Sequence, residues 1–519
     1  MRPLRLAPRP RLPRRGVHPE EHPALREQPV DPAGPAGLTA RPGAVVALAC
    51  TAQFVDVVGV TVLIVALPLI QRDLGLDAGT LSWVAAGYAL TFGGFLVAGG
   101  RAADRYGRRP MFAGGNALIA AGSLVCALAP AGWVLLAGRA AQGLGAALSV
   151  PAALAAVLAV VPPGVRRGRA LGLWTMAGAA GGASGFVLGG LISEYAGWRW
   201  LFAVIGPLTL AAAMLTPLVL PPPVAPDLKP KLARYGNTTT ARYPSGSRKW
   251  ERAQPAPGRS GPGDRGRLDL AGALLSTLSA VLLILGFTRA EGGGFADPWA
   301  WAPLLLAPLA VLAFLAVERR VPDPLVPPGI WSVRSFRAGA AVAAVLTATT
   351  SGAAVIGTLF LQDVLEVSAA ASGAGFLLFS AGVVAASTAV PAVLRRIGPV
   401  SAMSTGLGAV AAALGLQAVA VAQESFPLLL AGLAGAGLGL GVASVASTTH
   451  GTATVDESTA GLVGGLLNAA AQIGTAIGIA VLLLVASVRP GPAGQATAFT
   501  AASAVAALSA LTLAVRARR

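Results

Sequence analysis

Charged residues are scarce in this chain of 519 residues. Only 12% of its positions hold Asp, Glu, Lys or Arg, whereas 55% are hydrophobic. A soluble domain carries roughly twice that charged fraction. Acids are the scarcest, since 22 Asp and Glu stand against 39 Lys and Arg, a formal charge of +17. The arginines lie in short loops and tails rather than on one amphipathic face. We therefore expect a membrane protein and no nucleic-acid partner.

Cysteine and histidine are also rare. Cys50 and Cys126 both fall within apolar segments, which predicts small buried side chains and no disulfide framework. The three histidines are scattered and have no metal-ligand spacing. The sequence has no GxxxxGK[ST] phosphate loop, so we do not expect ATP hydrolysis. Since no nucleophile–base arrangement is visible either, we expect neither an enzyme nor a bound metal or cofactor.

Long apolar segments fill most of the chain instead. A membrane-spanning helix needs about 20 mostly apolar residues. Fourteen segments qualify: 44–68, 81–100, 110–129, 133–158, 169–191, 200–220, 268–288, 299–317, 338–361, 370–393, 400–421, 427–448, 461–486 and 496–515. The sequence therefore predicts an all-α polytopic protein with fourteen helices across the lipid bilayer.

The segments between these helices predict the domain organisation. Residues 1–43 are rich in Arg and Pro and lack the apolar core of a signal peptide, so we interpret them as a disordered cytoplasmic tail or the product of a mis-called start codon. Residues 221–267, with ten Lys and Arg, resemble a flexible cytoplasmic linker. Six-helix bundles are expected at 44–220 and 338–515, with an inserted helix pair at 268–318.

The basic residues predict the orientation in the membrane. If the N-terminus lies inside and the helices alternate, 34 of the 39 Lys and Arg fall on the inner side and four on the outer side, with Arg139 alone inside a span. Such asymmetry is the positive-inside rule. We expect a multi-pass protein of the inner (plasma) membrane, with both termini in the cytoplasm.

An internal repeat supports the two bundles. Residues 135–145 align with residues 429–439 at an offset of 294, and the same offset places the first predicted helix on the ninth. Repeated halves are common in secondary transporters, whose substrate sites lie where the repeats meet.

One short, mostly glycine and charged run lies between the second and third spans. Residues 100–109 resemble the motif GxLADRxGRKxxL of the major facilitator superfamily, with departures at Ala102 and Phe112. The resemblance implies a transporter that works by alternating access. It also implies a conformational latch at the loop, with Asp104 just before the third helix. The latch residues are Gly100, Asp104, Arg105, Gly107, Arg108 and Arg109.

Asp56 stands 12 residues into the first span, or about 18 Å along a helix. An acid near the bilayer centre is costly and should face the bundle interior or water. We interpret it as a proton or cation site, the alternative being permanent pairing with an arginine. Residues 53–68 resemble the LDxTxVNVALP pattern of fourteen-helix drug:proton antiporters, although the Asp position of the pattern holds Gly59 and Asp56 lies one turn earlier.

Arg139 begins a run, 139–147, that resembles the RxxQGxGxA motif of the same antiporters, in which this arginine is implicated in proton transfer. Arginine stays charged, so it must be paired or hydrated. The alternative is a side chain that snorkels to the outer headgroups. Its partner in the repeat is Leu433, so the fold does not demand a charge here.

Two further groups of residues complete the prediction. The fifth helix resembles the motif GxxxGPxxGG with Phe186 in place of Pro, and its glycines predict close helix packing: Gly181, Gly185, Gly189 and Gly190. Polar or aromatic residues within spans are candidates for a substrate cavity, or else satisfied polar side chains: Gln53, Tyr88, Asn116, Gln142, Trp174, Asn468 and Gln472.

The resemblance implies a monomeric exporter of small molecules, namely hydrophobic or cationic drugs, antibiotics or a self-made metabolite, in exchange for protons. The proton gradient would supply the energy. Three alternatives stay open. A metabolite uniporter or symporter is favoured if Phe186 abolishes the antiporter geometry. A polytopic membrane enzyme and the permease subunit of an ATP-driven pump have less support in the sequence.

Overall fold

The computed structural model describes residues 42–162, 165–220, 270–293, 298–321, 328–453, 457–489 and 491–518, together with Pro324 and Val326. Regular structure in these residues is helical, without strands. The helices are α1 (Pro42–Leu74), α2 (Ala78–Tyr106), α3 (Arg108–Ala127), α4 (Gly132–Val160), α5 (Val165–Tyr195), α6 (Arg199–Val219), α9 (Leu270–Gly293), α10 (Pro298–Glu318), η2 (Pro328–Ser332), α11 (Arg334–Leu359), η3 (Phe360–Val364), α12 (Ala369–Ala422), α13 (Phe426–Thr452), α14 (Glu457–Ser487) and α15 (Pro492–Arg518).

Fourteen segments of these helices are long and apolar enough to cross a membrane, which confirms the predicted number and the all-α class. Two of the segments, Ala369–Val390 and Ala392–Ala422, belong to α12, and the chain leaves helical geometry within α12 at Gly398, where φ is 75°. Residues 1–41 of the predicted tail and the whole of the predicted linker 221–267 lie outside the described residues. The division into two bundles and an inserted pair stays a prediction.

The junction between α2 and α3 is tighter than the sequence indicated. The run 100–109 was expected to be a loop, but α2 continues to Tyr106 and α3 begins at Arg108. Gly107 alone separates them, with φ at 104°, a value that glycine adopts without steric cost. Asp104 therefore lies in the last turn of α2, and its predicted position before the third helix was wrong.

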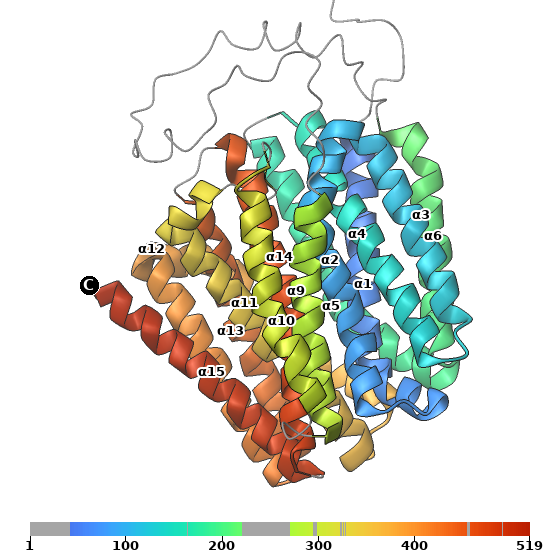
Figure 1. Ribbon diagram of the computed structural model, residues 1–519, viewed down its shortest axis with the longest axis vertical. Coiled ribbons are helices and arrows are strands. Elements are labelled where there is room, and N and C mark those ends of the chain that lie inside the picture. The colour runs from blue at the N-terminus through green and yellow to red at the C-terminus, as the bar shows by residue number, and fades with distance from the viewer. Residues whose placement is uncertain are drawn as a thin grey trace, which may run out of the picture. The chain divides into compact units, whose positions relative to one another are not determined.

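The helices pack in two similar sets. In the first set, α1 packs on α5, α4 on α2 and α3, and α3 on α6. In the second, α11 packs on α14, and α12 on α13 and α15. The sets meet where α5 contacts α12 and where α2 contacts α14. Helices α9 and α10 lie side by side, and α9 also contacts α2 and α14 (Figure 1).

Small residues bring the backbones together. A Cβ atom added to Gly143 of α4 would lie 2.3 Å from the Tyr88 carbonyl of α2. At the equivalent position in the second set, a Cβ added to Gly437 would lie 2.0 Å from the Phe379 carbonyl. Because both distances are far below van der Waals contact, each helix pair depends on glycine at that point. Glycines at equivalent positions therefore allow close helix packing in both sets.

The predicted packing face of α5 is present. Cβ atoms added to Gly181 and Gly189 would meet the carbonyls of Phe54 and Val62 in α1 at 2.6 and 2.8 Å. Gly185 lies between them, where a Cβ would come within 1.9 Å of the Thr61 hydroxyl. The predicted Gly190 turns elsewhere and would meet the Ala369 carbonyl of α12 at 2.3 Å. Three motif glycines therefore pack α5 on α1, and the fourth packs it on the other set.

We expect Gly185→Ala to destabilise the protein by about 2 kcal/mol, because the added methyl group overpacks the contact with Thr61. Gly182→Ala is the matched control on the same helix, since its nearest neighbour would be Val57 at 3.8 Å. This control should be neutral or slightly stabilising, because alanine favours helix more than glycine does. Thermal unfolding of both variants in detergent checks this. Equal melting temperatures would contradict the packing assignment.

Candidate functional site

A polar cluster connects three helices of the first set. The Tyr88 hydroxyl of α2 donates a hydrogen bond to the Asp56 carboxylate of α1, with 2.5 Å between the oxygens. The Arg139 guanidinium of α4 lies over the Tyr88 ring, 4.8 Å from its centroid. All three residues are described, and no ion pair within 4.0 Å joins Asp56 to Arg139 directly. Tyr88 therefore links the acid to the arginine, in place of the permanent pair considered from the sequence.

Arg139 is buried, with 1% of its surface exposed, and does not snorkel outward. Its guanidinium donates to the Gly59 carbonyl of α1 at 3.2 Å and to Gln142 Oε1 at 2.9 Å. Gln142 in turn donates to the Ser123 hydroxyl of α3 at 2.8 Å. A buried charge needs such partners, because its desolvation is costly. Arg139 thus ties α1 to α4 through the backbone of Gly59.

A central cavity lies next to this cluster. Its volume is about 270 Å³, near the lower limit for small-molecule pockets. Val60 and Thr61 line it one turn beyond Asp56, and Asp56 itself stays partly exposed. The lining comes from α1, α5, α11, α12 and α13, with hydroxyls from Thr61, Thr347, Thr350, Ser351 and Ser380 and rings from Phe186 and Phe379.

None of the seven residues predicted for a substrate cavity lines this space. Tyr88 and Gln142 belong to the polar cluster, and buried Asn116 donates to the Phe112 carbonyl one turn back. The others lie elsewhere: Gln53 beside Gly178, Trp174 against a separate apolar cluster, Asn468 exposed, and Gln472 against Gly93 of α2. Their binding role therefore gains no support from the cavity. The sequence feature that could have indicated the cavity is the segment Thr347–Ser351, which places several hydroxyl side chains within one apolar span.

The two sets of helices meet at the end of the bundle away from the α2–α3 junction. Arg72 at the end of α1 forms an ion pair with Asp363 of η3. Gln362 donates to the Val65 carbonyl of α1 at 2.8 Å, and the backbone N–H of Ala370 donates to Glu194 of α5 at 2.7 Å. No feature of the sequence indicated these contacts, which join α1 and α5 to η3 and α12.

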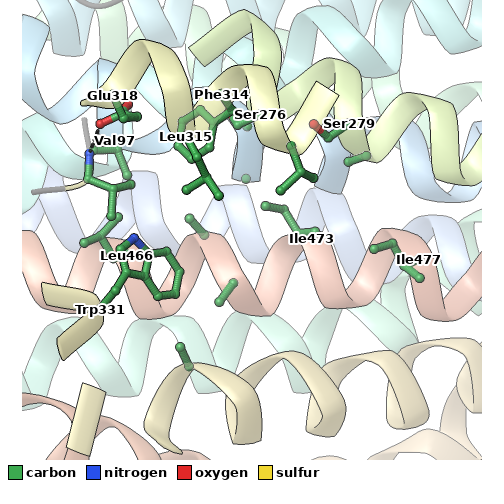
Figure 2. Close-up of a pocket in the computed structure, with 18 of the residues that line it drawn as sticks. Val97, Ser276, Ser279, Phe314, Leu315, Glu318, Trp331, Leu466, Ile473 and Ile477 are labelled. Atoms are coloured by element: carbon green, nitrogen blue, oxygen red, sulfur yellow. Dashed lines mark hydrogen bonds between the residues drawn. The ribbon is translucent and has the colours of Figure 1, made fainter. Parts of the chain in front are cut away.

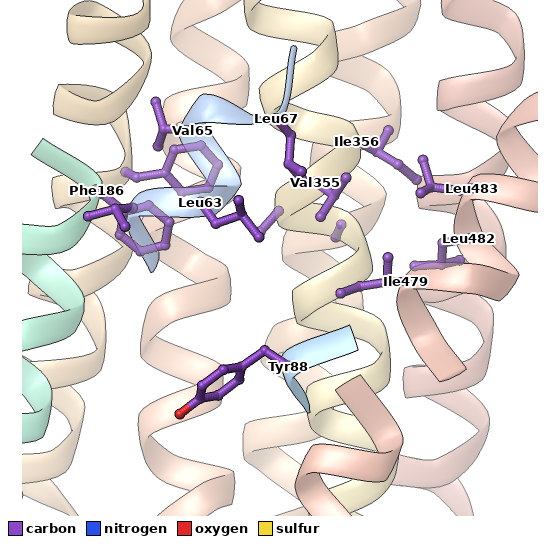
Figure 3. Close-up of a cluster of buried hydrophobic side chains, with 14 of the residues drawn as sticks. Leu63, Val65, Leu67, Tyr88, Phe186, Val355, Ile356, Ile479, Leu482 and Leu483 are labelled. Carbon is purple, nitrogen blue, oxygen red and sulfur yellow. The ribbon is translucent and has the colours of Figure 1, made fainter. Parts of the chain in front are cut away.

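Aromatic and aliphatic side chains fill the space below those contacts. Phe186, which stands at the motif's proline position, stacks on Phe376 of α12 with ring centroids 4.7 Å apart. Leu63 and Leu67 of α1 belong to the same buried cluster as Val355 of α11 (Figure 3). The central cavity is therefore separated from this end of the bundle by a packed apolar layer.

At the opposite end, the motif residues occupy the α2–α3 junction. Asp104 and Arg108 are exposed there. Arg101, beside the motif glycine Gly100, donates a hydrogen bond to the Pro324 carbonyl between α10 and α11. The latch role of the motif residues stays a prediction.

Comparison with known proteins agrees with the helical arrangement. Residues 49–261 match the sequence model of the Major Facilitator Superfamily. The chain belongs to this superfamily. Its fourteen spans fit the fourteen-helix type. Among solved structures, the human organic anion transporter MFSD10 has a TM-score of 0.57 at 18% identity, with 91% of this chain and 99% of that one covered. PepTSo, a POT family transporter, has a TM-score of 0.61 at 14% identity, covering 91% and 97%.

Curated superfamily relatives include antibiotic resistance and export proteins. The puromycin resistance protein pur8 of Streptomyces alboniger is 34% identical over 68% of this chain and 62% of its own length. The cephamycin export protein CmcT of Amycolatopsis lactamdurans is 35% identical over 64% of this chain and 61% of its own. The chain thus matches about three fifths of the length of these relatives.

We expect Arg139→Lys to destabilise the protein by about 2 kcal/mol. An ammonium group is strongly hydrated and lacks the planar guanidinium, which stacks on the Tyr88 ring while one of its nitrogens donates to two acceptors. The exchange therefore weakens hydrogen bonds made by a buried charged group. Arg489→Lys, an exchange at an exposed position, is the control. Thermal unfolding of the two variants decides the point. A melting temperature for Arg139→Lys equal to that of the control would contradict the assigned role.

Proposed function

We propose that this protein is a secondary active transporter that exports hydrophobic or cationic small molecules in exchange for protons. The observation that carries the proposal is the placement of Asp56, a partly exposed acid within a membrane span, one turn from a hydroxyl- and aromatic-lined cavity. Acids at such a depth are costly and mark ion or proton pathways. The names of the puromycin and cephamycin relatives support drug or antibiotic export.

The described conformation suits uptake of substrate from the inside. The Arg-rich α2–α3 junction is cytoplasmic by the positive-inside rule, so the end closed by Arg72, Asp363 and the Phe186–Phe376 stack is the outer one. We assign this conformation, with its outer end closed, to the inward-facing side of an alternating-access cycle. We place the protein in the plasma membrane with both termini inside, acting as a monomer.

The polar cluster offers a way to couple protons to this cycle. When Asp56 is ionised, the hydrogen bond that it accepts from the Tyr88 hydroxyl is charge-assisted. The negative carboxylate also attracts the positive guanidinium of Arg139, which lies over the Tyr88 ring. Protonation from outside would weaken both interactions and reduce attraction for a cationic substrate, which would leave outward. Proton loss to the cytoplasm would restore the charge. The proton gradient thus supplies the energy, and no resident cofactor is needed.

The cavity lining fits a loosely specified substrate. The hydroxyls of Thr350 and Ser351 are already engaged. Thr350 donates to the Leu346 carbonyl of its own helix at 2.8 Å, and the Ser351 hydroxyl lies 3.3 Å from the Thr475 hydroxyl of α14. Few polar groups are left to fix an orientation, so shape and apolar contact dominate recognition. This favours a range of apolar drugs or metabolites over one highly polar compound.

Asp56→Asn should remove proton coupling. The amide keeps the shape of the carboxyl group but cannot gain or lose a proton near neutral pH. In proteoliposomes with an imposed inward proton gradient, export of puromycin, or of the best compound from a drug-susceptibility panel, should fall to the rate seen without the gradient.

Glu424→Gln serves as the control, because it is also an acid-to-amide exchange but lies at an exposed turn between α12 and α13. This variant should transport normally. Undiminished gradient-driven export by Asp56→Asn would eliminate the proton mechanism. Transport by wild-type protein that ignores the gradient would favour a uniporter, the second candidate, which Phe186 at the motif's proline position supports.

Ala179→Phe should weaken substrate binding by narrowing the central cavity, which Ala179 lines. A loss of about 1.4 kcal/mol of contact would lower affinity tenfold. The neighbouring Ala180→Phe is the matched control, because Ala180 is exposed and does not line the cavity. Drug resistance conferred on an efflux-deficient host, at equal protein levels, gives the readout. Equal resistance from both variants would place the substrate elsewhere.

A further inference from the structure

A second, larger cavity lies beside the helix pair α9 and α10. Its volume is about 650 Å³, and its walls come from α2, α9, α10, α11 and α14 (Figure 2). Side chains such as Leu283, Phe314 and Ile473 make the lining mostly apolar. The residues of the Asp56 cluster take no part in it. The cavity is therefore separate from the proposed transport site.

The length of this cavity matches one leaflet of a bilayer. Its lining follows α14 from Leu466 to Ile477, a rise of about 16 Å at 1.5 Å per residue. Half of a hydrocarbon core of about 30 Å is of the same length. Leu466 lies with Trp331 and Glu318 at one end, and Ile477 lies with Ser279 at the other (Figure 2). Trp331 and Glu318 adjoin the chain between α10 and α11, at the membrane surface, so the cavity runs from that surface towards the bilayer centre.

The surface end of the cavity carries a positive charge and an interfacial ring. Arg319 lines this end just after α10 and is exposed. Trp331 is 44% exposed, as expected of an indole at headgroup level. The one acid in the lining, Glu318, is 3% exposed and accepts a hydrogen bond from the Val326 backbone N–H at 3.0 Å. Its carboxylate is thus engaged by the chain, while Arg319 is exposed.

We propose that this cavity binds one anionic phospholipid from the Arg-rich side of the membrane. One acyl chain fills the apolar volume between α9, α10 and α14, and the phosphate lies against Arg319. Basic pockets between membrane helices on the cytoplasmic side bind anionic headgroups in this way. Such a lipid would hold the α9–α10 pair against both sets of helices.

Native mass spectrometry of the full-length protein tests the proposal. The protein is released from vesicles of phosphatidylglycerol and phosphatidylcholine with identical acyl chains, mixed in equal amounts, and the retained lipid is counted. Wild-type protein should retain one lipid, with phosphatidylglycerol preferred. Ser276→Phe, which places a ring in the cavity, should abolish retention of both lipids. Leu278→Phe, on the same helix but exposed and outside the lining, should retain lipid normally.

Arg319→Gln separates headgroup recognition from tail binding. The variant should still retain a lipid, but its preference for phosphatidylglycerol should fall about fivefold, as expected for one basic contact near the surface. Arg396→Gln removes an exposed arginine on the same predicted membrane side, outside the lining, and should keep the preference. Retention unaffected by Ser276→Phe, an Arg319→Gln variant with unchanged preference, or displacement of the lipid by transported drug would each overturn the proposal.

Discussion

The burial of the Arg139 charge is the constraint from which the organisation of the first helix set follows. A guanidinium that is 1% exposed cannot give up its proton, so the fold must supply acceptors. It does so with a backbone carbonyl of α1, an amide of its own helix and the face of Tyr88. Gly143 of α4 lets α2 approach closely at the Tyr88 carbonyl, so this glycine helps to hold the tyrosine ring against the buried charge.

The second helix set shows that this arrangement is not required for folding. Gly437 contacts the Phe379 carbonyl as Gly143 contacts that of Tyr88, which makes Phe379 the counterpart of Tyr88. The repeat likewise places Leu433 opposite Arg139, and Leu433 is 3% exposed. The counterparts of the tyrosine and the arginine in the second half are therefore both apolar. Since a buried charge is costly compared with a packed hydrophobic residue, its presence in only one half is better explained by function than by stability.

The sequence predicted the parts of this structure that depend on local composition. The number of membrane spans follows from residue type alone, because the bilayer requires long apolar helices. The glycine face of α5 follows from residue spacing, because close helix packing requires small residues. The single-residue break between α2 and α3 at Gly107 was not predicted. A charged, glycine-rich run indicates a loop but does not indicate how long that loop is. The cavity was missed for another reason. Thr350 and Phe379 are ordinary in apolar helices and become a site only when α11 and α12 converge on α1.

Helix α1 connects the polar cluster to the outer contacts. Asp56 and Arg72 are separated by about 24 Å along the helix, and Val65, between them, accepts the bond from Gln362. Pro68 lies within the same helix and has no N–H, so the Ile64 carbonyl loses its usual helical partner at a residue that lines the cavity. A helix weakened at this point can bend between its two attachments. A change of charge at Asp56 would then reach the closed end through one element, without a relay of side chains across the bundle.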